Sequence, residues 1–181
     1  MIIKKKILAI PGSTRERSTN LNLIFAIADL CAEIFDVNVY RGLMHLPPFN
    51  PDNDNEQAGE AVADLRTQIK HADGVLICTP EYAMGVPGTL KNAIDWTVSS
   101  SDFYHKPTAL ITASSAGEKG HASLLETLKV IDANITAKTQ LLISHAKLKV
   151  SSDCKIIDEG TLAEVRALIG AFDSTISERA R

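Results

Sequence analysis

The chain has 181 residues, 45% of them hydrophobic and 23% charged, which is enough to build the core of one globular domain, and we expect a single domain over residues 1–181. A formal net charge of −3 provides no positive field for a nucleic acid, and no run of about 18 apolar residues is present to cross a bilayer. We therefore expect neither a nucleic-acid partner nor a membrane partner.

The first residues, MIIKKKILAI, do not predict secretion. Only four apolar residues follow Lys6 before Pro11, which is too few for the apolar region of a signal peptide. The three cysteines, Cys31, Cys78 and Cys154, are far apart and form no metal-ligand spacing, so we expect buried, reduced thiols and no metal site. A cytoplasmic location is the expectation.

Short apolar runs alternate with segments of helical period along the whole chain. The apolar runs predict strands at 5–10, 36–40, 74–79, 108–113 and 140–144. The helical spacing predicts helices at 20–35, 60–71, 88–99, 120–135 and 159–176, with residues 177–181 as a fraying end. This alternation is typical of a parallel sheet covered by helices on both faces, an α/β three-layer αβα sandwich.

One connection is unusually long. Residues 43–59 contain three prolines and show no hydrophobic period, so they predict an ordered surface loop. Loops of this length are often functional.

The loop after the first strand, PGSTRERSTN (residues 11–20), combines hydroxyl groups with Arg15 and Arg17 and leads into a helix. Backbone N–H groups and the dipole at a helix N-terminus favour an anion, and a guanidinium adds a charged fork. The loop lacks the Walker lysine and a GxGxxG run, so a monophosphate is favoured. The alternative is that Ser18, Thr19 or Asn20 only caps the helix.

The loops after the third and fourth strands, PEYAMGVPG (80–88) and SSAGEKG (114–120), are rich in small or turn-forming residues. Ligands of open parallel sheets bind beyond the carboxyl ends of the strands. We therefore expect both loops at the ligand site. Taken alone, Glu81 would be a surface charge and Tyr82 a core aromatic.

Hydrolytic chemistry has little support. The sequence contains no GxSxG and no HExxH motif, and its five histidines are scattered, each read as a surface or hydrogen-bonded side chain. We assign no catalytic residue.

Two motifs, GSxRxxSxN (12–20) and PEYxxxxPGxLKNAIDW (80–96), resemble those of the NADPH-dependent FMN reductase family, which includes quinone, azo and chromate reductases. The segments LPPFNPD (46–52) and SSAGEKG (114–120) resemble the flavin-side loops of that family. The resemblance implies a flavodoxin-like fold with strand order 2-1-3-4-5.

The resemblance also implies the site. The FMN phosphate would be held by Ser13, Arg15, Ser18, Thr19 and Asn20. The ring of FMN would be lined by Pro80, Glu81, Tyr82, Ala83, Ser114, Ser115 and Gly117, the first three through their backbone. Many family members carry Asn after the Tyr, where this chain has Ala83, and this departure bears on substrate preference.

The implied activity is transfer of hydride from NADPH or NADH to FMN, followed by reduction of a quinone, azo compound, free flavin or metal ion. The flavin performs the redox step, so the protein supplies position and electrostatics. A flavodoxin-type electron carrier and a non-redox module for another phosphate ligand remain as alternatives. The resemblance further implies a homodimer or homotetramer, with residues 44–54 and the helix at 88–99 as interface candidates.

Overall fold

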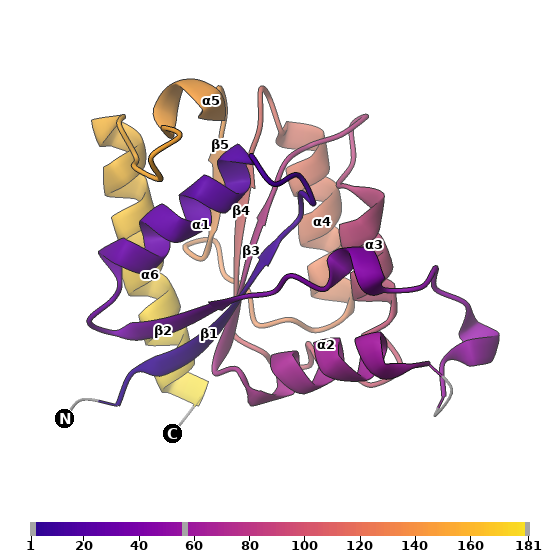
Figure 1. Cartoon of the computed structure of the whole chain (residues 1–181). Helices are drawn as coiled ribbons and strands as arrows, with labels where there is room; N and C mark the ends of the chain where they lie inside the picture. Colours follow the sequence, from indigo (N-terminus) through magenta and orange to yellow (C-terminus); the bar gives the residue numbers. More distant parts are fainter. Residues whose placement is uncertain (1–2, 56–57, 180–181) are drawn as a thin grey trace.

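The computed structural model describes residues 3–55 and 58–179. Within them, one parallel sheet has the strand order β2-β1-β3-β4-β5, which confirms the expected order (Figure 1). The strands are β1 (Lys5–Pro11), β2 (Phe35–Val39), β3 (Gly74–Thr79), β4 (Thr108–Ala113) and β5 (Gln140–Ile143).

Helices cover both faces of the sheet, which confirms the three-layer αβα sandwich. One face packs against α1 (Thr19–Leu30) and α6 (Glu159–Arg179). The other packs against α2 (Glu60–His71), α3 (Gly88–Asp95) and α4 (Glu118–Val130). The shorter elements are the 3₁₀ helices η1 (Leu43–His45) and η2 (Pro51–Asn53) and the helix α5 (Ala146–Lys149).

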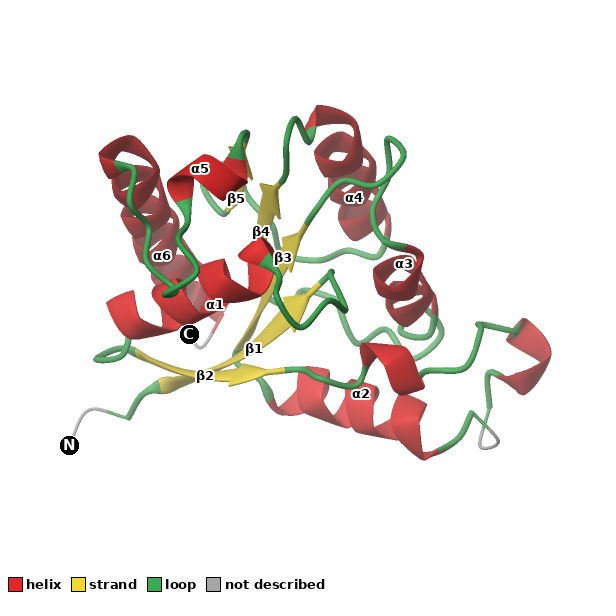
Figure 2. Cartoon of the chain, turned by 45° about the horizontal axis from the view of Figure 1, so that its top comes forward, coloured by secondary structure: helices red, strands yellow, loops and turns green. Residues whose placement is uncertain are grey.

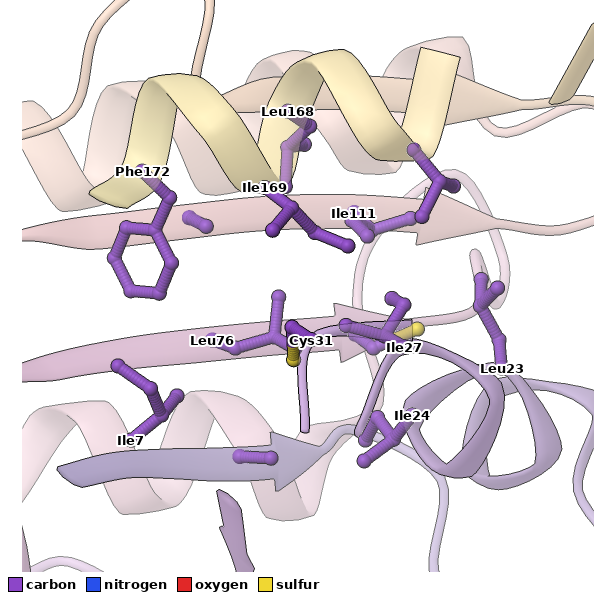
Figure 3. Close-up of a cluster of buried hydrophobic side chains, with 14 of the residues drawn as sticks. Ile7, Leu23, Ile24, Ile27, Cys31, Leu76, Ile111, Leu168, Ile169 and Phe172 are labelled. Atoms are coloured by element: carbon purple, nitrogen blue, oxygen red, sulfur yellow. The ribbon is translucent and has the colours of Figure 1, made fainter. Parts of the chain in front are cut away.

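Successive side chains of the central strands point to opposite faces of the sheet, which produces two hydrophobic cores. In β1, Ile7 belongs to the cluster under α1 and α6, whereas Leu8 belongs to the cluster under α2, α3 and α4. Figure 3 shows the first cluster, in which side chains of the strands meet Ile27 of α1 and Phe172 of α6. Full burial of one such side chain stabilises the fold by about 1.5–3 kcal/mol. The central strands are therefore apolar at nearly every position.

A large boundary difference lies at the end of α1. The helix ends at Leu30, with Cys31 as its C-cap, and not at residue 35 as the spacing predicted. Phe35 instead begins β2, pairs with Lys5 of β1, and packs edge-on against the Phe172 ring at a centroid distance of 5.7 Å. Tertiary burial of this ring overrides the helical period.

Other elements differ at their ends. Helix α3 stops at Asp95 and not at residue 99, α4 spans Glu118–Val130 and not 120–135, and α6 continues to Arg179. The strands β2 and β5 end at Val39 and Ile143, one residue before their predicted ends. The helix α5 was not predicted, because four residues are too few to show a period. The final residues of the predicted fraying end, 180–181, lie outside the described residues.

The long connection at 43–59 is ordered in its described part, as expected; residues 56–57 lie outside it. Its Pro47 carbonyl accepts hydrogen bonds from Asn92 Nδ2 at 2.9 Å and Trp96 Nε1 at 2.8 Å. The Phe49 backbone N–H donates to Asn92 Oδ1 at 2.7 Å, and its ring packs edge-on against Trp96. Asn92 and Trp96, both in the second motif, therefore fasten this loop to α3.

The three cysteines carry no disulfide. Cys31 and Cys78 are buried, as expected, whereas Cys154 is only partly buried. Burial raises the pKa of the Cys31 thiol to about 11, so this thiol is protonated at neutral pH. No helix in the described part of the chain has the length and apolar character needed to span a membrane.

Candidate FMN site

A cavity of about 350 Å³ lies beyond the carboxyl ends of the strands. The loops after β1, β3 and β4 gather at this edge of the sheet (Figure 2). The cavity volume falls within the range of small-molecule sites. The lining residues are Ser13, Arg15, Arg17, Ser18, Thr19, Asn20, Pro80, Glu81, Tyr82, Ala113, Ser114, Ser115, His145, Ala146, Lys147 and Leu148. Ten of the twelve predicted site residues are therefore brought together at one place.

The N-terminus of α1 opens on this cavity without a side-chain cap. Ser18 occupies the N-cap position, yet its side chain makes no capping hydrogen bond. The first N–H to find a helical acceptor is that of Asn22, which donates to the Ser18 carbonyl at 2.9 Å. The three preceding N–H groups have no acceptor within the helix. Simple capping by Ser18 thus does not account for this loop, and the helix end can bind an anion.

Two guanidinium groups stand beside this helix end. Arg15 and Arg17 are exposed and line the cavity, and neither forms an ion pair with a described residue. Ser13 is buried in the same loop, where its hydroxyl accepts a long hydrogen bond from the Arg15 N–H, 3.4 Å. The loop therefore offers two guanidinium groups that are not ion-paired with a carboxylate of the described residues.

Asn20 lines the cavity but directs its side chain into the protein. Its Nδ2 donates to the Ala113 carbonyl at 3.0 Å, and its Oδ1 accepts from Cys78 Sγ at 3.3 Å. Burial raises the pKa of the Cys78 thiol, which keeps it protonated as a donor. Asn20 therefore ties the start of α1 to the ends of β3 and β4.

The loop after β3 begins with a tight two-residue turn. Tyr82 and Gly85 exchange both backbone hydrogen bonds at 2.9 Å, and the residues between them, Ala83 and Met84, have φ values of 50° and 63°. Both turn residues are thus left-handed, as in a type I′ turn, which normally takes Asn and Gly. Each residue with a Cβ in this region costs about 1–2 kcal/mol.

Replacing Met84 with glycine should therefore raise the free energy of unfolding by about 1 kcal/mol, since glycine adopts a positive φ without a Cβ clash. Urea unfolding measures the change. Met44 is also exposed but has no positive φ, so Met44→Gly is the matched control and should bring no gain. An equal response of the two variants would contradict the turn geometry.

Glu81 has a role that the sequence did not reveal. Its carboxylate accepts a hydrogen bond of 2.7 Å from the Gly120 N–H, in the first turn of α4. A Cβ at position 120 would lie 2.8 Å from the Gly85 carbonyl oxygen and 3.0 Å from Glu81 Cγ. The close approach of the two loops therefore requires glycine at position 120, and Glu81 holds them together.

The loop after β4 contributes Ser114 and Ser115 to the cavity. The Ala146 N–H donates to the Ser114 carbonyl and the His145 N–H to that of Ser115, which brings residues 145–148 into the wall. Gly117 does not line the cavity: it is left-handed at φ 109°, and a Cβ there would meet Leu142 at 2.7 Å. Ala83 does not line it either, because it lies in the exposed turn.

Sequence reasoning missed five residues of the wall besides the backbone of Ala113. Arg17 was considered only as an alternative to Arg15, and His145 was taken as a surface or hydrogen-bonded histidine; it is exposed, left-handed, and part of the cavity. Ala146, Lys147 and Leu148 belong to no motif. The sheet topology could have indicated residues 145–148, because β5 pairs with β4 in parallel and its carboxyl end must reach the same edge.

His121 joins α4 to the outer part of the sheet. Its Nδ1 lies 2.9 Å from Thr112 Oγ1, and its Nε2 lies 3.2 Å from Gln140 Oε1. Because an amide oxygen only accepts, Nε2 carries the proton and Nδ1 accepts from the Thr112 hydroxyl. Burial lowers the pKa of this imidazole below its ordinary value of 6.5.

The folded state consequently favours neutral His121, whereas the unfolded chain binds a proton near the ordinary value of 6.5. The stabilisation is complete above that pH and is lost as the pH falls through the lowered pKa of the folded state. The Tm should therefore decrease as the pH falls below 6.5, and this decrease should be smaller in His121→Gln than in the wild type. The control is His71→Gln, at an exposed position, which should retain the decrease.

The sheet order and a cavity at its carboxyl edge, with an anion site at the first helix, define a flavodoxin-like nucleotide-binding α/β protein. Residues 5–147 match the family model of NADPH-dependent FMN reductase. The chain belongs to this family.

Individual relatives agree with the assignment. The chain is 33% identical over 181 residues to a quinone reductase of Escherichia coli strain K12, covering 96% of each chain. It is 37% identical over 127 residues to an NADPH azoreductase of Bacillus sp. strain OY1-2, covering 66% of this chain and 68% of the relative. Among solved structures it resembles FerB, a flavoenzyme NAD(P)H:(acceptor) oxidoreductase from Paracoccus denitrificans, with a TM-score of 0.86, 27% identity and coverage of 96% and 98%.

Proposed function

We propose that this protein is an FMN-dependent NAD(P)H oxidoreductase that reduces small-molecule acceptors. The observation that carries the proposal is the uncapped N-terminus of α1, which faces a cavity together with the guanidinium groups of Arg15 and Arg17, neither of them ion-paired within residues 3–55 and 58–179. Membership of the FMN reductase family supplies the identity of the anion, the phosphate of FMN.

The residues present fit that phosphate. The free N–H groups at the start of α1, the hydroxyls of Ser13, Ser18 and Thr19, and the guanidinium of Arg15 or Arg17 would hold it. Asn20 would act from behind, because its side chain is already bonded to Ala113 and Cys78. The chemistry that FMN supplies when bound is the acceptance of hydride and its delivery as electrons to a second substrate.

The two loops beyond β3 and β4 would orient the flavin ring. Pro80, Glu81 and Tyr82 line the cavity from one side and Ser114 and Ser115 from the other, with the Glu81–Gly120 hydrogen bond fixing their separation. No acid–base pair is required of the protein, because the redox step needs only position and electrostatics from it.

The acceptor would be a flat organic molecule such as a quinone, an azo compound or a free flavin. The exposed apolar side chains of Tyr82 and Leu148, 48% and 76% accessible, border the cavity and can stack against such a ring. The similarity to a quinone reductase and to an azoreductase supports this class. We place the reaction in the cytoplasm, where NAD(P)H is available to a reductase.

We further propose a homodimer or homotetramer. Exposed apolar side chains near the cavity, among them Met44 at 64% and Met84 at 75%, support an interface there. On α3, Leu90, Ala93 and Ile94 are buried in the core, so the part of this helix left for a partner is polar. Analytical ultracentrifugation of the purified protein, with Met44→Glu and Met84→Glu as variants, tests this assembly; a monomeric wild type contradicts it.

The visible spectrum of the purified protein, with added FMN if needed, tests the function. We expect flavin absorbance with bands shifted by binding, bleaching on anaerobic addition of NADPH or NADH, and recovery on addition of a quinone. Bound FMN that neither dinucleotide reduces would indicate an electron carrier instead. Absence of FMN binding would overturn the proposal.

A further inference from the structure

A second, smaller cavity adjoins the FMN site on the other side of the loop after β1. Its volume is about 200 Å³, and it shares Ser13 and Arg15 with the larger cavity. Arg17 lines only the larger cavity, whereas Arg41, which follows β2, lines the smaller one. The loop after β1 therefore separates two adjoining sites that have one guanidinium in common.

The walls of the smaller cavity suit an anion. Arg15 and Arg41 contribute two guanidinium groups, neither of them ion-paired with a described residue, and Thr14 adds a hydroxyl. The carboxylate of Glu16 also lines the cavity, which leaves a net charge of about +1 from these three side chains. This surplus stands out in a chain whose formal net charge is −3.

The Arg41 guanidinium lies over an aromatic ring. Its central carbon lies 5.7 Å from the centre of the Phe25 ring of α1, within the range of a cation–π interaction. The neighbouring residue, Tyr40, is buried in the cavity wall, and its N–H donates to the Ala9 carbonyl of β1 at 2.9 Å. Arg41 thus starts from a fixed backbone position, which reduces the entropy lost when it binds a ligand.

We propose that the smaller cavity binds the 2′-phosphate of NADPH and that Arg41 is the residue that distinguishes NADPH from NADH. This inference rests on the proposed function, since it takes the dinucleotide to be the reductant. The larger cavity accounts for the phosphate of FMN, and a second phosphate monoester is the chemical group in which NADPH differs from NADH. The smaller cavity is too small for a whole dinucleotide but has the charge for that group.

Calorimetric titration of the FMN-loaded protein with 2′,5′-ADP and with 5′-AMP tests the cavity without catalysis. We expect the wild type to bind 2′,5′-ADP about 10- to 100-fold more tightly, and Arg41→Gln to lose most of that difference. Arg166→Gln, on the exposed side of α6, removes the same charge from a helix that lines neither cavity and should keep it. Equal affinities in the wild type, or a difference kept by Arg41→Gln, would overturn the inference.

Two further measurements distinguish the remaining outcomes. In steady-state assays with a quinone, Arg41→Gln should lower kcat/KM for NADPH about 10- to 100-fold and change that for NADH less than twofold. Inorganic phosphate that binds as tightly as 2′,5′-ADP would identify a site for the free anion and refute the dinucleotide assignment. Failure of the FMN-loaded wild type to oxidise either dinucleotide would refute the proposed function, while calorimetry would still decide the ligand of the cavity.

Discussion

Replacing Arg15 with alanine is expected to weaken FMN binding by about 10- to 100-fold, the range for losing a charge-assisted hydrogen bond to a phosphate. Its guanidinium lines the cavity beside the uncapped N-terminus of α1 and has no ion-pair partner among the described residues. Folding should change little, because Arg15 is exposed. Fluorescence titration of FMN with the apoprotein measures the affinity, and urea unfolding measures the stability.

Arg166→Ala is the matched control for Arg15→Ala, because it removes an exposed arginine from α6, away from the cavity. Its FMN affinity should equal that of the wild type. Equal affinities of wild type and Arg15→Ala would show that the phosphate is bound elsewhere.

Exchanging Asn20 for aspartate should lower the free energy of unfolding by about 3 kcal/mol or more, the cost of an uncompensated buried charge. The change preserves shape but replaces the donating Nδ2 with an oxygen that faces the Ala113 carbonyl oxygen, 3.0 Å from the atom it replaces. The new charge would also repel a phosphate at the start of α1. Both folding and FMN affinity should therefore decrease.

The comparison variant is Asn22→Asp in the same helix. Asn22 is partly exposed and donates to the Ser151 carbonyl at 3.2 Å, so its substitution should cost about 1 kcal/mol or less. Urea unfolding of both variants measures the two costs. Similar costs would mean that the position of Asn20 behind the cavity carries no special structural role.

Much of the fold could be predicted from the sequence, because its dominant signals are local. The segments Gly74–Thr79 and Thr108–Ala113 are buried at every position and were predicted with correct bounds, as was helix Glu60–His71. The end of α1 was mispredicted since Ile34 continues the helical spacing while Phe35 is drawn into β2 by its packing on Phe172. That contact joins residues far apart in sequence, and no local pattern contains it.

The candidate site could likewise be predicted only in part. Loops that directly follow β1, β3 and β4 could be assigned to one edge from the topology of parallel sheets, and their residues do line one cavity. Other features depend on distances between loops. They are the hydrogen bond from Gly120 to Glu81 and the hydrogen bonds to Ser114 and Ser115 that bring residues 145–148 into the cavity wall. Such distances follow from the packed structure and not from any single segment.

Helix α6 lies outside the segment that the family model matches, yet it completes the core of the fold. The family match ends at residue 147, whereas α6 begins at Glu159. Its residues Val165, Leu168 and Phe172 nevertheless join the core that also contains Ile7 and Ile111 of the sheet. The part of the sequence that the family model matches is therefore shorter than the part that seals one face of the sheet. A homology boundary drawn at residue 147 would separate the cavity from the helix that supports the strands beneath it.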